Sequence, residues 1–531
     1  MRRLLFSLLF LPVVVCAEDR WIEFDSGPYQ VLTNAGDKAG RDALNYLEQL
    51  RYTLGTMLGK PDLHSIWPIR VIVLKSGKQF PDVKMGRDSY MASFLSIQPE
   101  TAADIIRILI DANAGRMPEN IERGLVSLFS TLSVQGTKVS IGIPPATKDR
   151  DWSRVHMLTV DPAYNGRLRV LLGNLQQGID AEPAYKNAFE KTPQQVDDQL
   201  NAYILAGNYG TAPLSGRPLD AKRQLYAKTP EPFTVALAQA DVLLANGASG
   251  SRELYTALLN QKAGASEPHE GLGSLDAAVK NDSHNAHTYV DLGRMTTNAA
   301  QKITLFTKAT QLNPRWAEPY ILRAETETVA FRRVPLLQTA TQLAPRNASY
   351  WRLLAEAQEA SNQFAEAGKS WGRAERATES FEERSMIRQA RQLGEAMRLD
   401  LQAKERQEVR RKQEQEMQDL KNRALSDIRA FEAKANQGQA PLDPNVKLGE
   451  YQEEKPVVVH GFLVRVDCLG TKAKLHVQGE DKKIRQVTIR DPSKVTIRGG
   501  GEKALGCGVQ KPARPLTIES LAGEVTNIEF H

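Results

Sequence analysis

The apolar positions in the first third of the chain switch between strand spacing and helix spacing. Residues 21–34 are extended and aromatic, and residues 37–58 then carry leucines on one helical face, at positions 44, 47, 50, 54 and 58. Short apolar runs at 69–74 and 91–97 are typical of buried strands. This order of strand, helix and strand predicts an α/β unit.

More elements of the same unit follow along the chain. Residues 101–113 show helical spacing, Met117 and Pro118 interrupt it, and residues 120–132 resume it. We expect a strand at 139–143 and a helix at 197–203. The α/β unit is therefore predicted to reach about residue 215.

From about residue 230 to residue 377 the strand patterns disappear and the sequence repeats itself. The text Ala-Thr-Gln-Leu occurs twice, and the surrounding pattern returns after 31 residues: Leu305, Ala309, Leu312 and Pro314 recur as Leu336, Ala340, Leu343 and Pro345. This displacement is close to the period of tetratricopeptide (TPR) repeats, about 34 residues, whose second helix ends at a proline. Residues 216–380 are predicted to form TPR-like helix pairs; the alternative is a non-repetitive helical bundle.

The first helix of each pair is expected near Tyr289, Tyr320 and Trp351, whose side chains we assign to the core. Gly293 and Ala355 occupy the small-residue position that lets paired helices approach closely. Residues 233–259 fit a further, more divergent pair. A solenoid leaves a concave face free, so its expected function is to bind a protein or peptide segment in that groove.

A long charged segment follows the repeats. Residues 382–434 have helical spacing with few apolar positions, which is typical of a solvated helix. A coiled-coil contact is the alternative, although sustained apolar heptads are missing. The composition of residues 436–450 indicates a linker.

In the last 80 or so residues the apolar period changes from that of a helix to that of a strand. Phe462, Val464, Val466 and Cys468 alternate with polar or opposite-facing neighbours, and later segments continue the pattern. We expect a small antiparallel barrel or sandwich over residues 451–531. Its outward basic residues could meet an acidic envelope polymer, although a solvated sheet face is the preferred explanation: Lys472, Lys474, Lys482, Lys483, Arg485 and Arg490.

Length and composition support a multidomain, mainly α-helical protein. A chain of 531 residues is too long for one core, and 41% hydrophobic with 25% charged residues is ordinary globular usage. The formal net charge of +6, to which Arg2 and Arg3 contribute, lacks the concentrated basic footprint of a nucleic-acid binder. Nucleic acid is therefore not an expected partner.

The N-terminus has the order of a secretory signal. Two arginines precede the apolar run 4–15, and small residues are placed for cleavage after Ala17. Cys16 suggests lipidation, but Val15 is the wrong preceding residue. No later stretch resembles a transmembrane helix, so we expect an exported protein of the periplasm or the extracellular space.

Two cysteines remain beyond the predicted signal. Cys468 and Cys507 form an even pair in a short segment, and an exported protein meets oxidising conditions. A disulfide is the leading interpretation, and two buried free thiols are the alternative. Two cysteines alone make a poor metal site.

The N-terminal unit resembles the exported peptidase-MA-like domains of the gluzincin class. The resemblance rests on residues 21–34, the helix with Leu47, Leu50 and Arg51, the strand 69–74, and Met117-Pro118 followed by Gly124-Leu125 and Phe129. It covers roughly residues 20–215, and such domains often precede TPR repeats. Active members carry His-Glu-x-x-His on one helix and a glutamate ligand on the next, so that one zinc ion and its activated water are held between the helices.

The residues that carry this chemistry are missing here. The corresponding positions read Ala103-Asp104-Ile105-Ile106-Arg107, and the third ligand position is Arg123. A methyl group cannot bind zinc, and two guanidinium groups would repel it. We therefore expect vestigial positions with no metal and no cofactor, and an ion pair of Asp104 or Glu122 with these arginines is a hypothesis for their present role.

No other constellation supplies catalysis. The eight histidines are scattered, and His284 and His287, three apart, are expected on the surface. No nucleophile elbow, phosphate loop or dinucleotide fingerprint occurs. The sequence thus predicts a pseudo-peptidase acting as a protein-binding scaffold, divided as signal 1–17, degenerate peptidase-like domain 18–215, repeats 216–380, charged helix 381–435, linker 436–450 and β-rich domain 451–531. The alternatives are a zinc-type peptidase with an unrecognised site and envelope-polymer binding through the β-rich domain.

Overall fold

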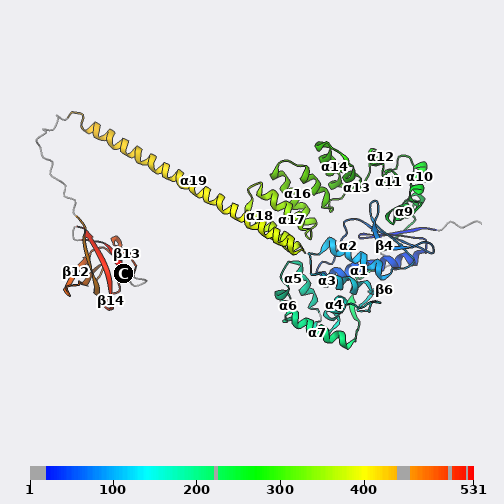
Figure 1. Ribbon diagram of the computed structural model, residues 1–531, viewed down its shortest axis with the longest axis horizontal. Helices are drawn as coiled ribbons and strands as arrows, with labels where there is room; N and C mark the ends of the chain where they lie inside the picture. The colour runs from blue at the N-terminus through cyan, green and yellow to red at the C-terminus, as the bar shows by residue number, and fades with distance from the viewer. Residues whose placement is uncertain are drawn as a thin grey trace, which may run out of the picture. The chain divides into compact units, whose positions relative to one another are not determined.

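The computed structural model describes residues 20–531 except 165, 220–224, 379, 439–454, 500–504 and 522–523. These residues form two compact units, divided after Gln413 (Figure 1). The expected signal sequence 1–17 lies outside the described residues, as does most of the expected linker 436–450.

A six-stranded sheet forms the centre of the head, which we define as residues 20–228. The sheet has the strand order β4-β5-β3-β2-β1-β9, in which β2, β3 and β5 run parallel. Strands β3 and β5 confirm two predictions, whereas β4 was missed and β9 lies beyond residue 215, where the sequence suggested that the repeats begin. The strands are β1 (Ile22–Ser26), β2 (Tyr29–Thr33), β3 (Ile69–Val73), β4 (Phe80–Met85), β5 (Tyr90–Phe94) and β9 (Ala227–Lys228).

Helix α1 (Asp37–Leu58) covers one face of this sheet and has the predicted bounds. Its leucines at 44, 47, 50 and 54 are fully buried in one core with Phe24, Val31 and Val71 from the sheet. The helix ends at Gly59, whose φ of 76° is a left-handed conformation that glycine adopts at little cost.

The remaining elements of the head extend this core. The expected helix pair is present as α2 (Pro99–Asn113) and α3 (Glu119–Ser130), and β7 and α7 confirm the strand and helix expected near 139 and 197. Helices α4, α5 and α6 and strands β6 and β8 were not predicted. Their bounds and those of β7 and α7 are β6 (Ser133–Gln135), β7 (Lys138–Ile141), α4 (Arg150–Val160), α5 (Leu168–Gln176), α6 (Ala181–Phe189), α7 (Pro193–Ala206) and β8 (Ala212–Ser215).

Ten helices, called the array below, follow the head (Figure 1). The predicted repeat is present, because α14 and α16 begin 31 residues apart and end 31 residues apart. Asparagine N-caps start α13 and α17, and Pro314 and Pro345 follow the ends of α14 and α16. The helices are α9 (Pro232–Ala245), α10 (Ser251–Gln261), α11 (Ser266–Gly271), α12 (Leu275–Lys280), α13 (Ala286–Met295), α14 (Ala299–Leu312), α15 (Glu318–Thr326), α16 (Ala330–Leu343), α17 (Ala348–Glu359) and α18 (Phe364–Ala377).

The packing inside the pairs confirms the small-residue position. A Cβ on Gly293 would lie 2.5 Å from Cε1 of Phe306, and Ala355 is fully buried. Tyr289 and Trp351 belong to the core as predicted. The paired helices therefore approach more closely than a larger side chain at these positions would allow.

The array shares its core with the head. Val235, Ala238 and Val242 of α9 pack on the face of the sheet opposite α1, where they bury Ile72 and Met91. This contact explains why the head and the array form one compact unit.

A buried network of charged groups reinforces this junction. Arg87, between β4 and β5, forms ion pairs with Asp88, with Asp241 of α9 at 3.2 Å, and with Glu270 of α11. Tyr255 of α10 donates a hydrogen bond to Asp241 at 2.6 Å. Burial alone would lower the pKa of Arg87, but the surrounding carboxylates, Asp241 first, raise that pKa well above its ordinary value.

The head also contacts the turns that precede the first helices of successive repeats. Asn285 Nδ2 donates to the carbonyl of Arg87 at 2.8 Å, and Asn313 Nδ2 donates to the carbonyl of Ile66 at 3.0 Å. Arg346 forms an ion pair with Glu122 of α3 at 2.5 Å. The array is thus attached to the head at intervals along its length.

Helix α19 (Phe381–Ala435) is one unbroken helix of 55 residues, as the charged segment predicted (Figure 1). Ile387 and Gly394 are its buried residues, and apolar side chains such as Met417 and Leu420 are exposed. Its residues from Glu414 onward belong to the second unit.

The C-terminal part forms one six-stranded sheet in the order β12-β11-β10-β14-β15-β13. Over the described residues the end strands β12 and β13 are not paired, so the expected closed barrel or two-sheet sandwich is not found, and β13 pairs parallel with β15. Cys468 and Cys507 form a disulfide with Cα atoms 5.7 Å apart. The strands are β10 (Val457–Leu469), β11 (Lys472–Gln478), β12 (Ile484–Ile489), β13 (Thr496–Arg498), β14 (Gly508–Leu521) and β15 (Glu524–Phe530).

A β-bulge changes which face of β10 is buried. The register shifts between Leu463 and Arg465, so that Leu463 and Val466 both enter the core. The simple alternation that placed Phe462 with Val466 is therefore wrong, and Phe462 is 47% exposed. In the described part of the chain, none of the helices combines the length and apolar character needed to span a bilayer.

Candidate functional site

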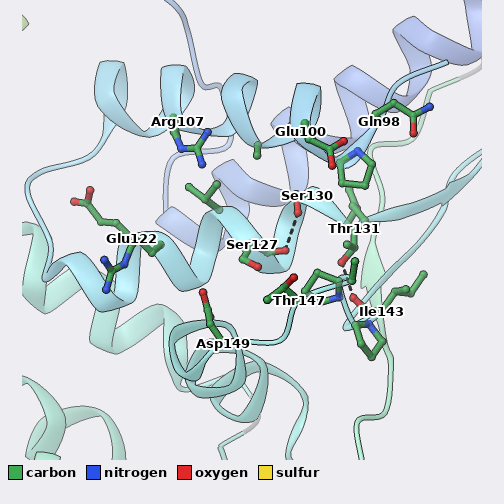
Figure 2. A pocket seen from close by; sticks show the side chains of 18 of the residues that line it. Gln98, Glu100, Arg107, Glu122, Ser127, Ser130, Thr131, Ile143, Thr147 and Asp149 are labelled. Carbon is green, nitrogen blue, oxygen red and sulfur yellow. Dashed lines mark hydrogen bonds between the residues drawn. The ribbon is translucent and has the colours of Figure 1, made fainter. Parts of the chain in front are cut away.

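A pocket of about 930 Å³ runs between α2 and α3 of the head. The segment 143–147 and Asp149 close its other side, and Figure 2 shows Arg107 extending from α2 toward α3. Apolar walls come from residues such as Ile110, Val126 and Ile143. Because the pocket opens where the resemblance places a metal centre, it is the candidate site of the head.

Three of the four vestigial positions line this pocket. They are Ala103, Arg107 and Arg123, and the fourth, Asp104, is not among the lining residues. Arg123 binds Glu119 at 2.9 Å and Asp151 at 2.7 Å, and the hydrogen bond to Asp151 raises the pKa of Arg123. The arrangement therefore places a methyl group and two permanent cations at positions that the resemblance matches to zinc ligands.

Asp104 instead covers the free edge of the sheet. Its Oδ2 accepts a hydrogen bond from the backbone N–H of Val83 in β4 at 3.1 Å, and its Oδ1 pairs with Arg107 at 2.6 Å. Thr101 donates to the neighbouring carbonyl of Pro81 at 2.9 Å. Edge strands bind extended peptides through such groups, so α2 occupies edge positions that a peptide strand would need.

The hypothesis of ion pairs at the old site holds for one of its two carboxylates. Asp104 pairs with Arg107 on the same helix, whereas Glu122 turns to Arg346 of the array and also accepts from the backbone N–H of Met117 at 2.9 Å. Glu122 therefore fastens the array to the head.

The motif around Gly124 has a packing explanation. A Cβ on Gly124 would lie 2.4 Å from the backbone oxygen of Asp151 and 2.4 Å from Cγ2 of Val155, both in α4. Glycine at this position lets α4 pack directly on α3. Gly124 therefore serves the packing of two helices of the head.

The pocket does not fit a zinc ion. Protein zinc sites are built mainly on thiolate and imidazole ligands, and the described lining residues include neither histidine nor cysteine. Carboxylates do line the pocket, but among the described residues no three of them are grouped so that they could hold a metal ion. Ser130 Oγ donates to the carbonyl of Ser127 at 2.9 Å, and Thr131 Oγ1 donates to the carbonyl of Ile143 at 2.6 Å, as the dashed lines in Figure 2 show. These hydroxyls are engaged with the backbone rather than with a base.

The two histidines that lie three positions apart, His284 and His287, have different environments in the structure. His284 is exposed as expected, but the prediction of a surface site is wrong for His287, whose ring stacks on Trp67 of the head at 4.0 Å and lies 4.5 Å from Trp316. This burial lowers the pKa of His287 to about 4. Within the described ranges, no group of three histidine, cysteine, aspartate or glutamate side chains has the geometry to hold a metal ion.

The first helices of the repeats form a second candidate surface, which we call the repeat face. Arg294 of α13 pairs with Glu318 of α15 and lies 3.6 Å from Asp291. Burial raises the pKa of Tyr350 of α17, and the charges of Glu318 and Glu325 of α15 raise it further. An ion pair thus joins the first helices α13 and α15, and the charges of α15 act on Tyr350 of the next first helix.

The basic residues of the C-terminal sheet divide into two groups. Arg485 pairs with Asp481 at 2.8 Å, and Arg490 pairs with Glu524 at 3.1 Å. The four lysines have no carboxylate partner in the described part of the sheet, and three are exposed while Lys474 is half-buried: Lys472, Lys474, Lys482 and Lys483. Neighbouring acids thus partly neutralise the expected basic surface.

Sequence reasoning missed the residues that join the head to the array. Arg87 and Asp241 lie 154 positions apart, and Glu122 and Arg346 lie 224 apart. No local pattern signals such pairs. One available hint was Asp241 itself, the one charged residue within the mainly apolar helix α9, because a buried carboxylate requires a partner.

Comparison with known proteins adds a limited likeness. No protein-family model matches this chain, and no curated protein sequence matches it. Among solved structures, the chain is similar to MamA (17% identity, TM-score 0.23, covering 27% of this chain and 91% of MamA) and to YrrB, a TPR protein with an unusual peptide-binding site (14%, TM-score 0.25, 30% and 98%). It is also similar to TTC0263, a TPR protein of Thermus thermophilus (18%, TM-score 0.20, 30% and 98%). With scores this low, the assignment of TPR-like repeats rests on the observed helix pairs.

Proposed function

We propose that this protein is a non-catalytic scaffold whose helical repeats bind a segment of another polypeptide. The observation that carries the proposal is the repeat face, where Arg294 of α13 pairs with Glu318 of α15 and the charges of α15 act on Tyr350 of α17. The turns that precede these helices are held by the head, so the face is presented on a fixed support. Preorganised surfaces bind with a smaller entropy cost.

In this proposal the head is a degenerate peptidase-like domain that now braces the array. Three of its former ligand positions are an alanine and two ion-paired arginines, and Asp104 covers the sheet edge. The carboxylate of Glu122 serves the junction with the array. Together these contacts favour a structural role over hydrolysis.

The proposal includes export, which rests on the order of basic, apolar and small residues at the N-terminus. The disulfide in the C-terminal sheet suits an oxidising compartment. The partner polypeptide is therefore sought among proteins of the cell envelope or the medium.

The repeat face is tested by affinity capture with the tagged full chain. We would compare it with the double variant Arg294→Ala and Glu318→Ala, and with a control, Glu395→Ala and Arg398→Ala, which removes an exposed ion pair of the same composition from α19. The expected result is one dominant envelope protein that the full chain and the control capture and the repeat-face variant loses. Equal capture by all three, or none by the full chain, would refute the proposal.

The absence of catalysis is tested separately. Purified full chain is expected to contain no stoichiometric zinc and to leave an unfolded protein substrate intact, with or without added zinc, because positions 103, 107 and 123 offer no ligand. Metal analysis and a peptidase assay measure both. Stoichiometric zinc accompanied by hydrolysis would establish the peptidase alternative.

A further inference from the structure

A cleft of about 870 Å³ lies where the end of the array meets the head and the start of α19. Its walls are the α2–α3 turn, the α5–α6 turn, the end of α18 and the first turns of α19. Five arginines line it, against three carboxylates among the described residues. We call it the arginine cleft, and its arginines are Arg116, Arg376, Arg384, Arg388 and Arg391.

Two of the three described carboxylates of the cleft are already paired with arginines. Glu375 is shared by Arg388 at 2.7 Å and Arg391 at 2.9 Å. Glu119 is engaged by Arg123 in the neighbouring pocket. Asp180 is the third carboxylate, so the described lining residues carry five arginines against three carboxylates, an excess of positive charge.

Two of the arginines are available to a ligand. Arg384 donates to the carbonyl of Thr378 at 3.0 Å, and neither Arg384 nor Arg376 has a carboxylate partner in the described part of the chain. The stem of Arg376 lies against Gly178, where an added Cβ would be 2.8 Å from Arg376 Cδ. Packing against this glycine holds the stem in place while its guanidinium group remains exposed.

The layout of the cleft suits an extended chain. Arg384, Arg388 and Arg391 follow one another on one side of α19 over about 10 Å, which about three residues of an extended peptide would match. Ile179, an exposed apolar side chain, stands on the opposite wall. The charges are thus spread along a cleft that also offers apolar contact, whereas a single small anion needs donors that converge on one point.

We propose that the arginine cleft binds an acidic, partly apolar segment of a partner polypeptide. Guanidinium groups bind carboxylates through two parallel hydrogen bonds, which gives arginine-lined clefts geometric as well as electrostatic preference. The carboxylates of the segment would pair with Arg376 and Arg384 and compete with Glu375 for Arg388 and Arg391. The proposal goes beyond the repeat face, because it concerns a different surface and names the charge of the ligand.

The probe is a fluorescein-labelled peptide of alternating glutamate and leucine, with a glutamine-for-glutamate peptide as its neutral match. Fluorescence anisotropy with the full chain is expected to show binding of the acidic peptide that weakens as salt is added, and little binding of the neutral one. The double variant Arg376→Gln and Arg384→Gln is expected to lower the affinity roughly tenfold or more. Neither substitution leaves a described carboxylate without its partner.

The matched control is Arg410→Gln with Arg411→Gln, two exposed arginines farther along the same helix in the first unit. We expect the control to bind the acidic peptide with the affinity of the unaltered chain, although its net charge changes as much as in the Arg376 and Arg384 variant. The proposal is overturned if both variants lose affinity equally, if both peptides bind alike, or if inorganic phosphate displaces the peptide as well as unlabelled peptide does. The repeat-face variant should still bind the peptide, so failure of the two proposals can be told apart.

Discussion

Replacing Arg87 by methionine tests whether the buried network holds the array on the head. The Arg87 side chain is 5% exposed, and its partners Asp241 and Glu270 are 0% and 3% exposed. Methionine keeps much of the apolar stem but leaves Glu270 without its cation, while Asp241 keeps only Arg70, at 3.4 Å. Breaking a buried ion pair by removing one partner costs about 3 to 5 kcal/mol.

This cost should appear as opening of the junction. Native-state hydrogen exchange of α9 and β5, which meet across the sheet face, measures the opening equilibrium. We expect the open fraction to rise by roughly two to four orders of magnitude, following from about 3 to 5 kcal/mol. Exchange in the C-terminal sheet, which belongs to the other unit, should not change.

The matched control is Arg123→Met, which removes an arginine that is 59% exposed and pairs with Glu119 and Asp151. Solvent screens exposed ion pairs such as these, so exchange in this variant should stay close to that of the unaltered chain. If Arg87→Met opens the junction no more than this control does, the network is not what holds the array.

Three further perturbations test packing, pH dependence and the disulfide. Gly293→Val should lower the melting temperature, because overpacking against Phe306 costs about 1 to 3 kcal/mol, whereas Gly368→Val, where the added group meets open space, should lose less. Burial holds the pKa of His287 at about 4, whereas the pKa of a histidine in an unfolded chain is about 6.5. The folded state is therefore fully stable above pH 6.5 with respect to this group and loses stability as the pH falls toward 4. Denaturant titration should measure a loss of about 3 kcal/mol, and the variant His287→Phe should not show this pH dependence. Cys468→Ser opens a disulfide with a sequence separation of 39, and calorimetry should show the C-terminal sheet destabilised by about 4 kcal/mol while the first unit melts unchanged.

Local patterns predicted the elements well where one face decides the structure. The leucine spacing of α1 gave both of its ends, and the 31-residue recurrence gave α14 and α16. In an amphipathic helix, the spacing of the apolar residues shows which side chains are buried. Strand β10 shows the limit of this reasoning. Its bulge inserts one residue and exchanges the two faces, which alternation alone cannot reveal.

For the candidate site, the sequence predicted only that the zinc ligands are missing. Ala103, Arg107 and Arg123 stood out because a known chemistry is missing from them, and three separate positions do converge on one pocket. The contacts that these residues make could not be predicted from the sequence, because Asp104 accepts a hydrogen bond from Val83, on a strand that the sequence did not predict. Contacts between residues far apart in the sequence produce no periodic pattern from which they could be predicted.

The attachment of the array to the head has a consequence for how this chain can change during evolution. Free solenoids lengthen or shorten by whole repeats, because each repeat contacts only its neighbours. Here Asn285, Asn313 and Arg346 each meet a separate place on the head. Inserting or deleting one 31-residue repeat among them would move every later turn away from the head residue that it contacts. The contacts with the head therefore restrict the number of repeats that this chain can have.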